Sequence, residues 1–207
     1  MKEKTAKKVK GVVRRDQIVQ SVLAVISRTG VGGLTTAALA REAGISEANL
    51  YRHFKNKDAI LMETMAFVRG RIARNMEEAF SGTADPLSKL RKFYQLQLEL
   101  MEKNCGILRF MFSDELHTSE KLKEKLLESM YAFSGMLAQL IKAAQKTGHV
   151  RPELDPKTTS LMLIGMVQGL MFRWSLSGFS FSLAAEGKKL WLNFEVCIKA
   201  AVRKNAV

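Results

Sequence analysis

Helical periodicity runs through almost the whole chain, and it restricts the fold more than any other feature. Between Thr118 and Thr147 the apolar residues recur every three or four positions, as they do along one side of a long helix. They are Leu122, Leu126, Met130, Phe133, Leu137, Leu140 and Ala144. No segment alternates apolar and polar residues over a length that indicates a sheet, and the 207 residues include only 3 prolines. The sequence therefore predicts an all-α protein.

Helix start and stop signals divide this pattern into about nine helices. Gly30 and Gly148 are typical stops, and the Asp-Pro pairs that begin at Asp85 and Asp155 are typical starts. The expected helices cover about 16–28, a short stretch between a cap at Thr35 or Thr36 and the turn at Gly44, 47–54, 57–80, 85 onward, a short irregular stretch after 106, 118–147, 155–173 and 183–203.

Positive charge is concentrated near the N-terminus. The formal net charge is +13, and residues 1–57 contain 12 Lys and Arg against 4 Asp and Glu. Such a gradient is typical of a surface that binds a polyanion, either nucleic acid or an anionic membrane, because each neutralised phosphate releases a counterion. A solubilising tail is the simpler alternative. Membrane anchoring is disfavoured because the first helix lacks a large basic face with interfacial Trp.

Several classes of protein have signatures that this sequence does not show. The longest apolar run, Leu161 to Val167, is far shorter than the roughly 20 residues of a bilayer-spanning helix, and we recognise no signal peptide, so a cytoplasmic location is expected. Cys105 and Cys197 are far apart and predict neither a disulfide framework nor a zinc site. No catalytic motif indicates an enzyme, and no cofactor or metal is expected.

The segment from Gly33 to Lys57 has the pattern of two short helices that cross at a tight turn. Ala40 and Ala43 allow the helices to approach closely, and Gly44 permits the turn between them. The wedge between the helices is filled by Ile45, Leu50 and Phe54. The pattern predicts a helix-turn-helix.

The free face of the second of these helices is narrow enough for the major groove of DNA. Its candidate base-reading residues are Glu47, Ala48, Asn49, Tyr51, Arg52 and His53. Candidate phosphate contacts are Thr35, Thr36, Tyr51 and Lys57, and Ser46 is a further candidate DNA contact. Either threonine can cap one helix, and Ser46 caps the other. Glu47 could accept from cytosine N4 or only stabilise the helix dipole, and Arg52 could address guanine or a phosphate.

This stretch resembles the DNA-binding domain of the TetR (tetracycline repressor) family of transcriptional regulators. Members show a Thr-Thr start, an Ala-Gly turn and a Leu-Tyr-x-His-Phe-x-x-Lys signature, which the segment from Leu50 to Lys57 matches at every specified place. The resemblance is strong over residues 12–72 and rests beyond them on the number, lengths and order of the helices. Ala37 and Ala38 depart from it, because relatives often carry polar or charged residues there, so fewer bases are expected to be read from that helix.

The resemblance implies a domain organisation and a mode of action. We expect a basic N-terminal arm at 1–13, a helix-turn-helix domain at 14–57, a connecting helix at 58–82 and a ligand-binding and dimerisation domain at 83–207. The implied protein is a homodimer, paired through its last two helices, that binds a palindromic operator on the bacterial nucleoid. The implied regulator is a repressor released by a small apolar or amphipathic ligand. The alternative is a DNA-binding protein with a structural or cell-cycle role, controlled by DNA or a protein partner.

Candidate ligand contacts lie on helices that enclose the cavity in this family. They are Phe110, Met111, Met130, Phe133, Met166, Arg173 and Trp174. Core packing is the simpler interpretation of the apolar ones. Arg173 could anchor a ligand carboxylate or phosphate if it is buried, or it could pair with a carboxylate at the end of its helix. Asp114, Glu115 and His117 could be called metal ligands, but capping and solvation explain them more simply.

Overall fold

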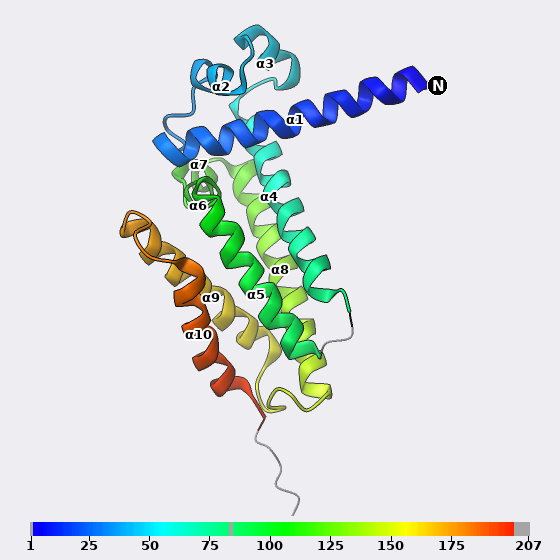
Figure 1. Cartoon of the computed structure of the whole chain (residues 1–207), viewed down its shortest axis with the longest axis vertical. Coiled ribbons are helices and arrows are strands. Elements are labelled where there is room, and N and C mark those ends of the chain that lie inside the picture. The colour runs from blue at the N-terminus through cyan, green and yellow to red at the C-terminus, as the bar shows by residue number, and fades with distance from the viewer. Residues whose placement is uncertain (1, 83–84, 201–207) are drawn as a thin grey trace, which may run out of the picture. The chain divides into compact units, whose positions relative to one another are not determined.

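The computed structural model of the chain describes residues 2–82 and 85–200, with side chains from Arg15 onward. Within this part the chain forms ten helices and no strand (Figure 1). The helices are α1 (Lys2–Thr29), α2 (Thr36–Ala43), α3 (Glu47–His53), α4 (Lys57–Phe80), α5 (Pro86–Lys103), α6 (Cys105–Met111), α7 (Asp114–Thr118), α8 (Glu120–Lys146), α9 (Pro156–Leu176) and α10 (Leu183–Ile198). The predicted all-α class is confirmed.

Most helices begin and end close to the predicted residues. Gly30 and Gly148, which follow α1 and α8, both have the positive φ that favours glycine, +71° and +74°. The short helix expected after residue 106 is divided into α6 and α7. The helix expected to end near Arg203 ends at Ile198, and residues 201–203 lie outside the described part of the chain.

The first helix begins much earlier than expected, at Lys2 and not near Asp16. Residues 2–15 contain no proline and consist mainly of Lys, Arg, Val, Ala and Glu, which extend a helix once its first turns are fixed. The prediction that the first helix begins near Asp16 is thus wrong: the residues of the expected basic arm at 1–13 are helical from Lys2 onward, and Met1 lies outside the described residues. A missing apolar face in the sequence therefore does not indicate a missing helix.

By their contacts the residues group into two compact units. The head unit contains residues up to 71 and residues 104–126, and the body unit contains residues 72–103 and those from 127 onward. The divisions fall inside α4, inside α8 and between α5 and α6. The sequence-based boundaries differ from these, because they place 104–126 with the C-terminal domain, whereas α6 packs against α1.

The packing of α6 on α1 depends on Gly106. A Cβ atom at this position would lie 2.1 Å from the carbonyl oxygen of Leu23, so only glycine allows the two helix backbones to approach so closely. The inward face of α1 is the predicted one, since Ile18, Val22, Val25 and Ile26 are all buried. The head core therefore includes a helix that lies far from it in sequence.

We expect Gly106→Ala to destabilise the protein by about 1–3 kcal/mol, because the new methyl group forces α6 away from the α1 backbone. Urea unfolding followed by circular dichroism measures the effect. Gly135→Ala in α8 is the matched control, since nothing lies within 4 Å of a Cβ atom there. Alanine favours helix over glycine by about 1 kcal/mol, so the control variant should be at least as stable as the wild type. Equal stabilities of the two variants would contradict the tight contact.

In the body unit α10 packs against α5 around a second glycine. A Cβ atom at Gly187 would lie 1.9 Å from Cδ1 of Leu98. The hydroxyl of Tyr94 donates to the carbonyl oxygen of Gly187 over 2.8 Å, and its ring centroid lies 5.2 Å from that of Trp191. Burial raises the pKa of Tyr94 to about 12, so the hydroxyl stays a donor over the physiological range.

The start of α10 is capped by a side chain from α5. The carboxylate of Glu102 accepts hydrogen bonds from the backbone N–H groups of Leu183 and Ala184, at 3.0 and 3.3 Å. Ser182 caps the same turn through its own hydroxyl, which accepts from Ala185 N–H at 3.2 Å. A negative charge at the N-terminus of a helix is favourable. The last turn of α5 is therefore fixed to the first turn of α10.

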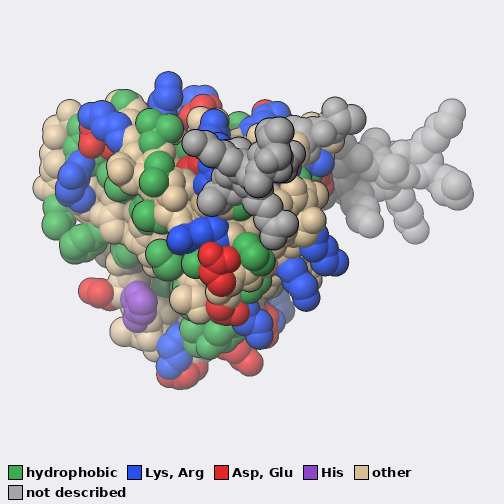
Figure 2. Space-filling model, turned by 90° about the horizontal axis from the view of Figure 1, so that it is seen from below, with side chains coloured by type: hydrophobic (Ala, Val, Ile, Leu, Met, Phe, Trp, Pro, Cys, Tyr) green, Lys and Arg blue, Asp and Glu red, His purple; other side chains and the backbone are tan. Residues whose placement is uncertain are grey.

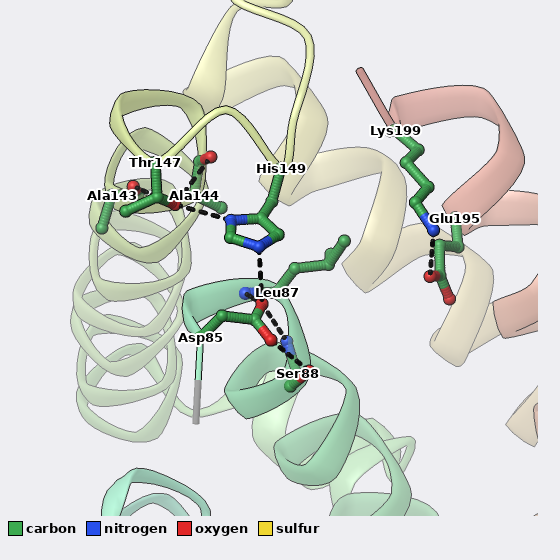
Figure 3. Close-up of polar contacts among 9 residues, drawn as sticks. All are labelled: Asp85, Leu87, Ser88, Ala143, Ala144, Thr147, His149, Glu195 and Lys199. Atoms are coloured by element: carbon green, nitrogen blue, oxygen red, sulfur yellow. Dashed lines mark hydrogen bonds and ion pairs between the residues drawn. The ribbon is translucent and has the colours of Figure 1, made fainter. Parts of the chain in front are cut away.

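The start of α5 is tied to the segment that follows α8 (Figure 3). Asp85 Oδ1 accepts from the backbone N–H groups of Leu87 and Ser88, at 2.9 and 3.0 Å, and Ser88 Oγ donates to Oδ2. The ring of His149 reaches toward the same carboxylate, with Nε2 3.9 Å from Oδ1, and its Nδ1 lies 2.9 Å from the hydroxyl of Thr147. The Ser88 hydroxyl bond above all, with the nearby His149 and the backbone bonds, holds the pKa of Asp85 below its ordinary value despite partial burial.

We expect Asp85→Ala to lower the stability by about 0.5–2 kcal/mol near neutral pH, through the lost cap. Since the folded-state pKa of Asp85 lies below the ordinary 3.8, its contribution is fully present above that value and is lost as the pH falls through the folded-state pKa. The difference between wild type and variant should therefore shrink in acid. Urea unfolding at about pH 7 and about pH 3 checks this, with Asp85→Asn as the control that keeps a cap without a charge. An Asp85→Ala deficit that is equal at both pH values would contradict the role of the charge.

Candidate nucleic-acid interface

The connection between α2 and α3 is fixed by two caps and a glycine. Thr35 Oγ1 accepts from Ala38 N–H at 3.1 Å, so Thr35 and not Thr36 is the cap of α2. Gly44 follows α2 in the left-handed conformation, with φ +62°. Ser46 Oγ accepts from Asn49 N–H at 3.2 Å and caps α3, as predicted. The two caps and the glycine, all visible in the sequence, thus set the angle between α2 and α3.

One side of α3 faces the core and the other faces solvent. Leu50 is buried, as is Phe54 directly after the helix. The solvent side carries Ala48, Tyr51 and Arg52, with Asn49 and His53 half-buried at its edges. Within the described part of the chain, the side chains of Tyr51 and Arg52 make no hydrogen bond or ion pair. The candidate base-reading residues are therefore accessible or partly so, and their contact with bases stays a prediction.

Glu47 differs from the other residues of this face because it is engaged within the protein. The hydroxyl of Thr36 donates to Glu47 Oε2 over 2.6 Å, which joins the first turn of α2 to the first turn of α3. The contact gives both side chains a part in fixing the angle between these helices. Neither sequence-based interpretation of Glu47, as a contact to cytosine or as a charge on the helix dipole, includes this role.

Lys57, the first residue of α4, also has partners within the head unit. Its Nζ atom donates to the carbonyl oxygen of Val31 at 3.3 Å and lies 3.6 Å from Oε1 of Glu115 on α7. The side chain is still 44% exposed. An ammonium group has three N–H donors, so a phosphate can bind the third donor or replace one of these two partners.

Arg15 is a residue of this region to which the sequence assigns no particular role. Its guanidinium donates to the carbonyl oxygen of His53 at 3.4 Å and lies 5.9 Å from the centroid of the Phe54 ring. It also lies 4.0 Å from the carboxylate of Glu63. A cation at the C-terminal end of a helix is favourable, so Arg15 steadies the end of α3. Its charge is visible in the sequence, but only the fold brings it to α3, 38 residues away.

The candidate ligand contacts belong to different units. Phe110 and Met111 lie on α6 in the head unit, whereas Met130, Phe133, Met166, Arg173 and Trp174 lie in the body unit. Phe110 and Trp174 are almost fully buried, and Trp174 Nε1 donates to the carbonyl oxygen of Phe181 at 2.8 Å. Phe133 is half-buried, with its ring 5.7 Å from that of Phe93, and Met166 is also half-buried.

Met130 is 41% exposed, which corrects its expected place on the buried stripe of α8. Met130 lies seven residues, or nearly two full turns, before the buried Leu137, so the two lie on almost the same side of α8 and helix phase alone does not decide burial. In this half of α8 the buried positions are Leu137, Ala138, Ile141 and Ala144.

Arg173 lies at the surface, near the end of α9. Its side chain is 62% exposed, with NH2 3.4 Å from Glu186 and the guanidinium 4.8 Å from the Phe181 ring centroid. Lys189 first, and Arg173 second, hold the pKa of Glu186 below its ordinary value. Arg173 is therefore paired with a carboxylate, as the simpler interpretation predicts, and it is not a buried anchor.

The described residues contain no group of three or more His, Cys, Asp or Glu side chains that could hold a metal ion, and Glu115, one of the residues considered, pairs with Lys57. Among the helices of residues 2–82 and 85–200, none combines the length and the apolar character needed to span a bilayer.

The geometry of the head unit defines the class of protein. A capped helix-turn-helix with an exposed polar face on its second helix, in the most basic part of the chain, is characteristic of a DNA-binding protein. The chain matches the family model of bacterial regulatory proteins of the tetR family over residues 18–64, and that of the tetracyclin repressor-like C-terminal domain over residues 83–175. It belongs to the TetR family and is a DNA-binding transcriptional regulator.

Individual relatives cover nearly the whole chain. The nucleoid occlusion factor SlmA of Vibrio cholerae serotype O1 is 27% identical over 192 residues, which span 92% of this chain and 98% of that protein. The fatty acid degradation regulator FadR from Bacillus halodurans has a similar structure, with a TM-score of 0.80 at 19% identity over 88% of this chain and 94% of that one. FadR from Bacillus subtilis, solved in complex with stearoyl-CoA, gives 0.77 at 20% identity over 86% and 96%. The two structural likenesses show the fold alone.

We expect Arg52→Ala to reduce discrimination between a preferred duplex and its single-mismatch variants by about 1–3 kcal/mol, and Asn49→Ala to do the same at another base pair. Lys57→Ala should instead weaken binding to all duplexes alike, because it removes a charge that we expect to contact phosphate and not bases. Dissociation constants at fixed salt measure both effects. Lys142→Ala, an exposed position on α8 in the body unit, controls for lost charge. Wild-type binding by all three head variants would remove α3 from the interface.

Proposed function

We propose that this protein is a cytoplasmic, nucleoid-associated repressor that binds a palindromic operator as a homodimer. The observation that carries the proposal is the exposed face of α3, on which Tyr51 and Arg52 are free of partners within the described residues. One such helix reads one half-site, so a palindromic operator is matched by two heads related by twofold symmetry. The regulator acts by occupying DNA, and enzymatic activity is no part of the proposal.

Exposed apolar side chains on the last two helices support the proposed dimer. Leu161, Met162, Phe172 and Leu176 on α9, and Leu192 and Val196 on α10, are each more than half exposed. Gly165 and Gly169 on α9 have open space where a Cβ atom would be. Hydrophobic side chains are visible among Lys and Arg on the side where α9 and α10 lie in Figure 1, when the molecule is viewed from below (Figure 2). A second copy of the same face would cover them.

Release by a small apolar or amphipathic ligand is the proposed control. Its support is the fold that this chain shares with FadR from Bacillus subtilis, which was solved with stearoyl-CoA. The expected observation is that such a compound lowers the affinity of the protein for its operator.

A second candidate function is a role on the nucleoid that needs no small ligand. The similarity to SlmA, a nucleoid occlusion factor, over 92% of the chain favours it. Titration of the protein–operator complex with stearoyl-CoA separates the two candidates. Release supports the ligand-controlled repressor, whereas unchanged binding together with many sites spread over the chromosome supports the second role.

Selection of bound sequences from a random duplex library at moderate salt, followed by footprinting of the selected site, tests the proposed function. The expected result is a palindromic site with two protected half-sites. Salt-sensitive binding without sequence preference would contradict an operator function, because contacts to phosphate alone carry no sequence information.

We expect the double variant Leu176→Glu, Val196→Glu to be monomeric, because two charges per subunit would be buried in the proposed interface. Its affinity for the palindromic site should fall by about 10²- to 10⁴-fold, through loss of the linkage between two heads. Sedimentation velocity and DNA binding measure the two effects. Tyr131→Glu is the control, since this exposed residue lies on α8 and outside the proposed interface. A double variant that stays dimeric would show that the dimer forms elsewhere.

A further inference from the structure

The contact between Lys57 and Glu115 gives the head unit a feature that DNA binding alone does not explain. Lys57 begins α4, directly after the helix-turn-helix, and its ammonium group is a proposed phosphate contact. In this structure the group is held by the carbonyl oxygen of Val31 at 3.3 Å and by the carboxylate of Glu115 at 3.6 Å. A single cation therefore joins α4, the segment before α2, and α7.

Packing of α6 and α7 holds the backbone at Glu115 in place. It lies on the short helix α7, which is anchored by the buried side chain of Leu116. The preceding helix α6 is held against α1 by the close approach of Gly106 to Leu23. Glu115 consequently belongs to a packed part of the head unit.

The pair is open to competition because neither partner is buried. The side chains of Lys57 and Glu115 are 44% and 30% exposed. The closely spaced phosphates of DNA attract cations strongly, and a cation that neutralises one of them releases a counterion, so DNA can draw the ammonium group away from a partly exposed carboxylate. When Lys57 turns to a phosphate, Glu115 loses its partner and its negative charge is left close to the DNA backbone.

We propose that Glu115 is an electrostatic latch that lowers the DNA affinity of this regulator by competing with phosphate for Lys57. The inference rests on the proposed function, operator binding, and on the predicted contact of Lys57 with the operator backbone. Through Glu115, α7 reduces the affinity of the head unit for DNA. Because α8 begins just after α7 and continues into the body unit, the latch lies on a segment that joins the two units in sequence.

The test measures operator affinity against salt concentration for the full-length wild type and for Glu115→Gln. Half-exposed ion pairs contribute little, so release of Lys57 should tighten binding by about 1.5- to 5-fold per head. Two heads on one operator multiply to about 2- to 25-fold. The dependence of log K on log salt should steepen by up to about 0.9 per head, because Lys57 then neutralises a phosphate without leaving a carboxylate unpaired.

Two further variants separate the latch from a general effect of charge. Asp114→Asn removes an exposed carboxylate from the adjacent position of α7, and it should tighten binding less than Glu115→Gln does. In a Lys57→Gln background, Glu115→Gln should change affinity no more than Asp114→Asn does in the wild type. Circular dichroism confirms that each variant is folded.

The outcomes distinguish this inference from the function on which it rests. Equal effects of Glu115→Gln and Asp114→Asn in the wild-type background would overturn the latch, and so would weaker binding by Glu115→Gln, which would make Glu115 a positioning residue for Lys57. Unchanged DNA binding by Lys57→Gln alone would mean that the start of α4 does not contact DNA, and it would count against the proposed interface itself.

Discussion

The close approach of α6 to α1 at Gly106 and Leu23 determines more of the structure than any single side-chain contact. Because a Cβ atom at Gly106 would meet the backbone of α1, the contact exists only with glycine at this position. It brings residues 104–126 into the head unit, although 32 residues of the body unit, 72–103, separate them from its first part. With α6 fixed, α7 follows it and places Glu115 beside Lys57. A backbone contact in the core thus decides which charges surround a residue of the DNA-binding surface.

Several carboxylates of the head unit have partners inside that unit. Glu42 pairs with Arg28, Glu47 with Thr36, Glu63 with Arg15 and Glu115 with Lys57. Each exposed pair contributes about 0–1 kcal/mol, so their importance for stability is small. Their effect is on the local field, since the carboxylates reduce the positive potential that Arg15, Arg28 and Lys57 offer to DNA.

The sequence predicts the parts of this structure that depend on local chemistry. The turn at Gly44 and the cap at Ser46 act within three or four residues and are confirmed, and the structure selects Thr35 over Thr36 as the cap of α2. The exposed side of α3 follows in the same way from Leu50 and Phe54. Contacts between distant residues leave no such local signal, which is why neither the place of α6 nor the role of Arg15 at α3 was predicted. Met130 shows a further limit, because an apolar residue at helical spacing is not necessarily buried.

The discontinuity of the head unit limits how this regulator can be taken apart. A fragment that ends near residue 82 would contain the complete helix-turn-helix and would still lack α6, so the part of α1 around Leu23 would be uncovered and exposed to water. A chimera that transplants this DNA specificity onto another ligand-sensing scaffold would have to carry residues 104–126 together with residues up to 71. Recombination within the family would be subject to the same restriction, since an exchange at the apparent end of the DNA-binding domain separates two pieces of one hydrophobic core.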